Sequence, residues 1–263
     1  MLISGKTVLL TGATGGIGHA IARRLTAGGA RLILTGRRKE VLEPLARELG
    51  AQSLAVDLAD RDAVDRLAAE CAEVDVLVAN AALPASGPVV SFSTEELDRA
   101  LDVNLRAPIL LSRVIGERMA TRGSGHIVLI SSLSGKAATQ GSGIYSATKF
   151  GLRGFGAGLR EDLRTAGVGV SVVFPGFISD AGMFADSGVE LPRGVGTSTP
   201  EQVAAGVAEA IDRNRGELDV APVSMRVGAK FAGLAPRLSA AVSRRAGADK
   251  IAGEMHAGQL GKR

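Results

Sequence analysis

Residues 7–18, TVLLTGATGGIG, decide the fold of this chain. An apolar run typical of a buried strand ends at Thr11, and a glycine-rich turn then leads into a helical pattern. Such a turn brings backbone N–H groups and a helix N-terminus against a pyrophosphate. Gly12 and Gly16 stand four residues apart, so the spacing is not G-x-G-x-x-G. The turn by itself is therefore weak evidence for a dinucleotide site.

Short apolar runs alternate with amphipathic helical patterns along most of the chain. We expect strands at 7–11, 31–35, 52–56, 74–79, 126–131, 168–174 and 217–221. The helical patterns fall at about 16–28, 39–49, 61–72, 94–120, 143–166 and 199–215. Strands rich in Val, Leu and Ile, each followed by a helix, indicate a parallel sheet covered on both faces. The predicted fold class is α/β, a doubly wound seven-stranded parallel sheet that binds its ligand at the carboxyl ends of the strands.

We expect one folded domain over residues 1–222, since 263 residues with 46% hydrophobic side chains can bury a sizeable core. Segment 177–199 interrupts the alternation. It is rich in glycine and carries Met183, Phe184 and Leu191, a composition typical of a mobile substrate lid with an apolar underside. A long surface loop fits the same composition equally well.

The segment 223–263 forms a basic tail. It holds eight Lys/Arg and two acidic residues, so its own net charge is +6. Because the whole chain has a net charge of +4, residues 1–222 have a net charge near −2. Its apolar residues recur at steps of three and four, at Val227, Phe231, Leu234, Leu238 and Val242. This spacing predicts amphipathic helix that Pro236 splits into two short helices. Packing on the body or on a neighbouring subunit is favoured over docking on a membrane surface. Because the basic charge belongs to the tail, no nucleic acid is expected as a partner.

Cysteine usage and hydropathy indicate a cytoplasmic protein. The single cysteine, Cys71, excludes an internal disulfide and suits a reducing compartment. The chain enters KTVLLTG at residue 6 without the pattern of a cleavable signal, and no apolar run reaches the roughly 18 residues of a membrane span. No metal site is expected.

The residues at the end of the second expected strand indicate whether the cofactor is NAD(H) or NADP(H). An NAD enzyme needs an acidic residue about 20 residues after the first glycine, where it accepts hydrogen bonds from the ribose 2′-hydroxyl. Gly36 occupies that place here, and Arg37 and Arg38 follow it. A guanidinium matches a 2′-phosphate, so the sequence favours NADP(H) over NAD(H). The alternative is that the two arginines only cap the strand–helix turn in solvent.

Tyr145 and Lys149 lie one helical turn apart in YSATK. At about 4 Å and an effective dielectric constant near 20, an ammonium stabilises a phenolate by roughly 4 kcal/mol, or about three pKa units. Burial of the pair offsets part of this. We therefore expect the pKa of Tyr145 to be lowered enough for it to act as an acid or base near neutrality.

Several elements in fixed order resemble the single-domain short-chain dehydrogenases/reductases over about residues 5–220. They are TGATGGIG at 11–18, NAA at 80–82, Asn104 in LDVNL, Ser132 thirteen residues before Tyr145, YSATK at 145–149 and PGFI at 175–178. The resemblance implies a Rossmann fold and an NAD(P)-dependent oxidoreductase that interconverts a carbonyl and a secondary alcohol. The order and spacing of all these elements are far more specific than any single one.

The resemblance implies a role for each of four catalytic residues. Tyr145 would donate the proton in reduction and accept it in oxidation, while Lys149 lowers the pKa of Tyr145 and holds the nicotinamide ribose. Ser132 would hydrogen-bond the substrate oxygen. It is chosen over the nearby Ser131 and Ser134 by its spacing, and adjacent residues on an extended backbone face opposite ways. Asn104 would order a water that links Lys149 to solvent.

The resemblance also implies the cofactor contacts. They are Gly12, Thr14, Gly15, Gly16, Ile17, Gly18, Arg37, Arg38, Asp57, Leu58, Asn80, Ala81, Tyr145, Lys149, Pro175, Gly176 and Ile178. Two positions depart from the family pattern. Ala82 replaces a usual glycine, and Asp180 replaces a threonine that meets the nicotinamide carboxamide. Because an acid near the pyrophosphate is repulsive, either Ser179 takes that contact or the loop follows another path.

Two other classes of function compete with the oxidoreductase. A non-catalytic dinucleotide-binding sensor or structural subunit would lack part of the catalytic set, whereas all four residues are present here. A sugar-nucleotide epimerase or dehydratase needs a substantial C-terminal substrate domain, and only the tail follows the last expected strand. The expected substrate is a small, apolar carbonyl or alcohol. A homodimer or homotetramer is expected through the helices at 94–120 and 143–166, whose glycines permit close helix approach.

Overall fold

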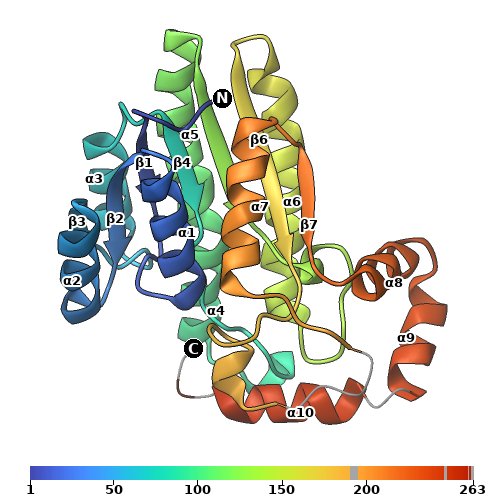
Figure 1. Ribbon diagram of the computed structural model, residues 1–263. Helices are drawn as coiled ribbons and strands as arrows, with labels where there is room; N and C mark the ends of the chain where they lie inside the picture. The colour runs from blue at the N-terminus through green and yellow to red at the C-terminus, as the bar shows by residue number, and fades with distance from the viewer. Residues whose placement is uncertain (190–194, 246–247, 260, 262–263) are drawn as a thin grey trace.

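A computed structural model of the chain describes residues 1–189, 195–245, 248–259 and 261. Its centre is a seven-stranded sheet in the order β3-β2-β1-β4-β5-β6-β7 (Figure 1). The strands are β1 Thr7–Leu10, β2 Arg31–Gly36, β3 Gln52–Ala55, β4 Val76–Ala79, β5 Gly125–Ile130, β6 Val168–Pro175 and β7 Glu217–Val220. Every neighbouring pair is parallel. The predicted doubly wound α/β sheet is confirmed.

Helices cover the sheet on both faces. They are α1 Gly16–Ala27, α2 Lys39–Leu49, α3 Arg61–Glu70, α4 Thr94–Leu101, α5 Ala107–Arg122, α6 Gly143–Arg164 and α7 Pro200–Asp212. Helices α1, α2 and α7 bury their apolar sides in one core, and α3, α5 and α6 bury theirs in a second core. Figure 1 shows α1 and α7 in front of the sheet, with α5 and α6 behind it.

Strand β1 explains why the strands read as continuous apolar runs. Val8 and Leu10 belong to the core on one face of the sheet, whereas Leu9 belongs to the core on the other. Successive side chains of a strand point to opposite faces, so a strand covered on both faces is apolar at most of its positions.

The prediction of one continuous helix at 94–120 is wrong, because a π turn interrupts it. Helix α4 runs into a π turn, η2 Asp102–Arg106, and only then does α5 begin. Pro108 stands in the first turn of α5 and has no N–H to donate to the carbonyl of Asn104 four residues earlier. The backbone widens at this place instead of continuing as α-helix. Such π turns are frequent at functional sites.

Three short helices lie in the loops at the carboxyl ends of the strands: η1 Val89–Ser91, η3 Leu133–Gly135 and η4 Ala185–Ser187. The last of these belongs to segment 177–199, in which Leu191 lies outside the described residues.

The tail forms three helices, α8 Val223–Leu234, α9 Pro236–Arg245 and α10 Ala248–Gln259, where two were expected. The predicted break at Pro236 is confirmed. The apolar side chains of Val227, Phe231, Leu234 and Leu238 are exposed, so the body does not cover this stripe, and its expected packing on a neighbouring subunit stays a prediction. The side chain of Val242 lies outside the described part. Among the described residues, no helix combines the length and apolar character needed to cross a membrane.

Candidate active site

Tyr145 and Lys149 lie one turn apart near the start of α6, at the carboxyl end of β5. The ammonium nitrogen of Lys149 stands 5.5 Å from the centroid of the Tyr145 ring. It donates a hydrogen bond of 2.9 Å to the carbonyl of Ile130, the last residue of β5. Lys149 is only 1% exposed, so helix and strand together hold this cation inside the protein.

Burial controls the titration of both groups. It raises the pKa of Tyr145 to about 12, and a hydrogen bond with the Ser132 side chain opposes this rise. Burial lowers the pKa of Lys149 to about 8. The expected lowering of the Tyr145 pKa is not found, because burial of the phenol disfavours its charged form more than the Ser132 hydrogen bond favours it. At neutral pH, Tyr145 is therefore a neutral phenol that can donate a proton.

Ser132 lies two residues after the end of β5 and caps η3, where its hydroxyl oxygen accepts a hydrogen bond of 3.1 Å from the amide of Ser134. The adjacent Ser131 is buried and donates to the carbonyl of Lys149 at 2.9 Å. The two neighbouring hydroxyls thus serve different partners. Ser132 meets Tyr145, whereas Ser131 fastens the strand to α6.

Asn104 lies in the π turn and is fully buried. Its side-chain amide donates to the carbonyl of Leu83 at 2.9 Å, and its carbonyl accepts from the amide of Leu83 at 2.6 Å. This pair of bonds fastens the loop after β4 to the π turn. One N–H and one lone pair of Asn104 remain for other partners. Its role in ordering a water beside Lys149 stays a prediction.

The glycine-rich turn approaches other backbone closely. Gly12 has φ +68°, and a Cβ there would lie 2.7 Å from Cα of Ala81. A Cβ on Gly18 would collide with the carbonyl of Gly12. Only glycine satisfies either position. Gly15 is the N-cap of α1 and provides no side-chain cap, which leaves the first N–H groups of the helix available to an anion.

Asn80 and Thr11 hold the turn in place. The Asn80 amide donates to the carbonyls of Thr11 and Gly12 at 3.0 and 3.2 Å. The Thr11 hydroxyl oxygen accepts from the backbone amides of Asn80 and Ala81 at 3.0 and 3.1 Å. Sequence reasoning named Asn80 and Ala81 but missed Thr11, whose place at the end of a strand before a glycine was the available signal.

Gly36, at the end of β2, packs against Thr14 of the glycine-rich turn. A Cβ on Gly36 would lie 2.6 Å from Cγ2 of Thr14, so an acidic side chain at 36 would require Thr14 to move. Arg38 donates to the carbonyl of Thr14 at 2.6 Å, and both Arg37 and Arg38 are exposed. Arg38 therefore stands against the turn and Arg37 lies near enough to Asp57 to act on its carboxylate, so two guanidinium groups follow the position at which an NAD enzyme carries an acid.

Asp57 follows β3 and pairs with Arg99 of α4 at 2.9 Å. Burial raises its pKa, but hydrogen bonds from the Ala59 amide and from Arg99 outweigh burial and hold the pKa below its ordinary value. Leu58 beside it is buried. Sequence reasoning missed Arg99, since no local pattern connects it to a residue 42 positions earlier.

The loop after β6 returns to the glycine-rich turn. Ile178 is buried and bridges to Ser198. Asp180 has φ +66° and accepts a hydrogen bond of 2.7 Å from the Ser179 hydroxyl. A Cβ on Gly16 would collide with Ala181, so this loop lies directly on the turn. The Ser179 hydroxyl is thus engaged within the loop, which favours a different loop path over the substitution of Ser179 for a threonine.

Pro175 and Gly176 join this loop to β6. The amide of Gly176 donates to the carbonyl of Val220 at 3.0 Å, and a Cβ on Gly176 would lie 2.9 Å from Cβ of Ala221. The carboxyl ends of β6 and β7 are thereby packed together beside Ser132, whose hydroxyl lies 3.5 Å from the Pro175 carbonyl.

These residues fit a dinucleotide. The close approach at Gly12, the uncapped start of α1 and the arginines after β2 suit a pyrophosphate and a second phosphate. Asp180 is an acid on the loop that lies against the turn and opposes an anion, and Ser179 already donates to its carboxylate. Ile17, in the first turn of α1, is partly buried and packs against the core.

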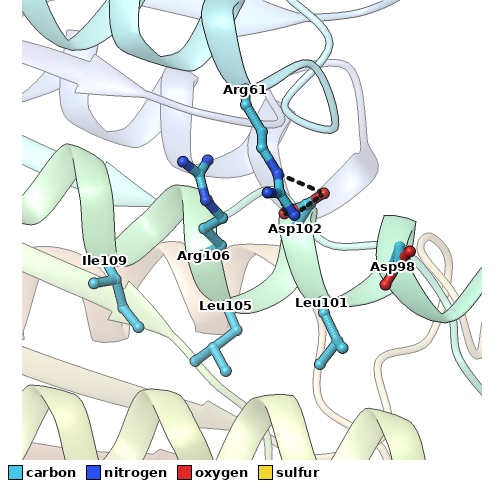
Figure 2. Close-up of a pocket in the computed structure, with 7 residues that line it drawn as sticks. All are labelled: Arg61, Asp98, Leu101, Asp102, Leu105, Arg106 and Ile109. Atoms are coloured by element: carbon cyan, nitrogen blue, oxygen red, sulfur yellow. Dashed lines mark hydrogen bonds and ion pairs between the residues drawn. The ribbon is translucent and has the colours of Figure 1, made fainter.

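A separate depression of ≈ 380 Å³ lies on the outer side of the π turn. Figure 2 shows Leu101, Leu105 and Ile109 pointing to the same side of it, while Arg61 pairs with Asp102. None of the four candidate catalytic side chains lines this depression. It belongs to the outer face of the helical layer and not to the site at the carboxyl ends of the strands.

Known proteins share both sequence and fold with this chain. A family model described as short chain dehydrogenase matches residues 6–190. Ketoacyl reductase HetN from a Nostoc species is 35% identical over 227 residues, which cover 83% of this chain and 79% of that protein. The 3-oxoacyl-(acyl-carrier-protein) reductase FabG from Rickettsia bellii is 35% identical over 178 residues, 67% of this chain and 74% of that protein.

A solved structure agrees with these relatives. A short-chain dehydrogenase from Sphingobium yanoikuyae, solved in complex with NADPH, superimposes with a TM-score of 0.77 at 27% identity. The match covers 89% of this chain and 95% of that one.

Proposed function

The chain belongs to the short-chain dehydrogenase/reductase family, and from this premise we propose that it is an NADP(H)-dependent oxidoreductase that interconverts a carbonyl and a secondary alcohol. The observation that carries the proposal is the meeting of Ser132, Tyr145 and Lys149 at the carboxyl end of β5. In doubly wound sheets this end is where ligands bind.

The proton chemistry rests on Tyr145. Its phenol keeps its proton at neutral pH and donates it to the substrate oxygen in reduction. A bound nicotinamide supplies the hydride. Ser132, within hydrogen-bond reach of Tyr145, stabilises the charge that develops on the same oxygen. Lys149 places a buried positive charge beside the phenol and favours its ionised form when the proton has left.

The preference for NADP(H) rests on the end of β2. Thr14 fills the space in which an acidic side chain at 36 would stand, and Arg37 and Arg38 supply positive charge beside it. An anionic 2′-phosphate gains hydrogen bonds there and meets no carboxylate at position 36. The NADPH complex of the Sphingobium yanoikuyae enzyme supports this choice.

The proposed substrate is an apolar carbonyl compound, such as a ketoacyl group. Two relatives are named as a ketoacyl reductase and a 3-oxoacyl-(acyl-carrier-protein) reductase. In the segment proposed as a substrate lid, the rings of Phe177 and Phe184 pack at 4.8 Å between centroids. Apolar side chains of this kind in a lid favour apolar substrates.

Replacement of Tyr145 by Phe tests the reaction. Tyr145→Phe removes the proton donor and keeps the ring, so we expect loss of turnover with NADPH binding retained. Turnover is followed by NADPH oxidation on a panel of ketones and aldehydes, and binding by fluorescence of the nicotinamide. Ser132→Ala should slow turnover strongly, whereas its neighbour Ser134→Ala should change it little. Full activity of Tyr145→Phe contradicts the assignment, and binding without turnover by the native protein favours the non-catalytic sensor.

Replacement of Arg37 tests the cofactor. We expect the native protein to prefer NADPH over NADH in kcat/KM, and Arg37→Ala to narrow this preference about tenfold, because a charge-assisted hydrogen bond contributes roughly 1.5 kcal/mol. Arg47→Ala, at an exposed position on α2, the helix that follows Arg37, is the matched control and should leave the ratio unchanged. Equal use of both cofactors by the native protein refutes the preference.

A further inference from the structure

Helices α8 and α9 present an uncovered apolar stripe. Val227, Phe231 and Leu234 are 60%, 44% and 86% exposed, and Val223 and Leu238 at its two ends are 64% and 56% exposed. The four residues in α8 recur at steps of three and four, so they lie on one side of the helix. Figure 1 shows α8 and α9 at the margin of the molecule beside β7.

The side of α8 opposite the apolar stripe packs on the body of the protein. Ala229 is buried in the core, and Met225 packs against it. A Cβ on Gly176 would lie 3.4 Å from Cε of Met225, so α8 rests on the end of β6. The helix is therefore anchored by its inner residues, and the apolar stripe on its outer side is held away from the body.

Cations border the stripe, and acidic residues are absent from this part of the sequence. Between positions 223 and 245 the chain has five basic and no acidic residues. Lys230 is exposed on α8, next to Phe231, and Arg237 is exposed beside Leu238. Arg244 and Arg245 are exposed at the end of α9. The exposed large apolar side chains of α8 and α9 are thus accompanied by charged residues that are all basic.

We propose that α8 and α9 form a docking surface for an anionic lipid membrane. The apolar side chains enter the boundary between headgroups and acyl chains, while the cations pair with lipid phosphates. A second copy of this chain fits less well, because an isologous contact would bring the basic residues of α8 and α9 from two copies together. An anionic membrane satisfies both properties of the surface at once.

The docking surface lies at the same end of the molecule as the active site. Helix α8 follows β7 at its carboxyl end, and a Cβ on Gly233 would lie 3.9 Å from the carbonyl of Lys136 in the loop after Ser132. Attachment through α8 and α9 would bring the site close to the lipid surface. This attachment goes beyond the proposed reaction and does not depend on it.

Sedimentation with vesicles tests the proposal without any measurement of turnover. We expect the full chain to bind vesicles of phosphatidylcholine and phosphatidylglycerol in equal parts, and to be released at high salt. Lys230→Gln combined with Arg237→Gln should weaken partitioning about fivefold per cation removed. Val227→Ser combined with Leu234→Ser should weaken it at least about tenfold, since two exposed apolar side chains no longer enter the lipid.

Matched variants at other exposed positions control for changes in the protein as a whole. Val90 is 91% exposed and Arg47 is exposed on α2, so Val90→Ser and Arg47→Gln should bind vesicles like the native chain. Circular dichroism confirms that each variant is folded. Failure of the native chain to bind anionic vesicles overturns the proposal. So does equal binding to pure phosphatidylcholine, or a loss of self-association in Val227→Ser/Leu234→Ser, which would identify the stripe as an interface between copies.

Discussion

At the scale of single residues, burial controls the titration of Tyr145 and Lys149. The four-residue spacing brings a cation to the phenol, as expected, but the cation lies over the ring and binds the Ile130 carbonyl. Burial disfavours the charged form of both groups, so the pKa of the phenol rises and that of the ammonium falls. The phenol is thereby kept as an acid, which is the form that a carbonyl reduction requires.

The lowered pKa of Lys149 predicts a pH-dependent stability. Between its folded pKa of about 8 and its ordinary value of 10.5, the unfolded chain binds a proton at this lysine that the folded protein has released. The free energy of unfolding of the native protein, relative to that of Lys149→Met, should therefore rise by up to about 1.4 kcal/mol per pH unit in this window. Chemical denaturation across the window measures the difference.

Below pH 8 the cost of burying this cation is fully present, so Lys149→Met should be the more stable protein at neutral pH, by about 3 kcal/mol at most. The lost hydrogen bond to Ile130 reduces the gain. Lys39→Met, at an exposed position of α2, controls for the loss of a lysine as such. A difference between native protein and Lys149→Met that does not change with pH contradicts the prediction.

At the scale of elements, Lys136 joins the loop that carries Ser132 to the edge strand β7. Its ammonium lies 2.6 Å from Asp219 and 2.9 Å from Glu217, and stands 3.8 Å from the centroid of the Phe174 ring. Arg153 of α6 pairs with Glu217 at 2.7 Å from the other side. Loop, strand and catalytic helix are thus connected through one largely buried cluster of charges.

Replacement of Lys136 by Met should destabilise the fold by about 3 kcal/mol, because the nearly buried Asp219 carboxylate loses its partner. The double variant Lys136→Met/Asp219→Leu should recover most of this loss, since it removes the buried charge together with the cation. Urea denaturation of the single and double variants measures both effects. A double variant no more stable than Lys136→Met would show that the cluster does not act as a buried ion pair.

At the scale of the whole molecule, the outer side of α4, α5 and α6 is the proposed contact between copies of the chain. Leu101 is 41% and Phe150 is 42% exposed on this side. A Cβ on Gly154 or Gly158 of α6 would meet no atom within 4 Å, so the helix surface is open there. Small side chains on an open helix permit a neighbouring helix to approach closely.

Substitution of Gly158 tests this contact. Gly158→Glu fits the isolated chain, because its Cβ enters open space and helix propensity rises by about 0.5 kcal/mol or more. In a dimer the same side chain would meet the opposing helix. We expect the native chain to be a dimer or tetramer by light scattering and Gly158→Glu to be a folded monomer. Val90→Glu, at an exposed position outside this face, is the control, and a native monomer would contradict the proposal.

The sequence by itself determined the parallel sheet and the identity of the candidate catalytic residues. The evidence for both is local: continuous apolar strands, helices between them, and YSATK at a fixed distance after Ser132. Local patterns of this kind can be recognised without knowing which distant residues come into contact. The glycine-rich turn belongs with them in part, because the positive φ of Gly12 is a local demand, whereas the close approach of Gly12 to Ala81 is a long-range contact.

Only the tertiary structure decided what depends on distant partners. The pKa of Tyr145 follows from burial, and Asp57 pairs with Arg99 from another helix. Lys136 meets carboxylates more than 80 positions later in the chain. The tail shows the same limit, since periodicity identified its apolar stripe but not whether the body covers it. Burial and long-range pairing depend on how elements pack, and no local pattern encodes that packing.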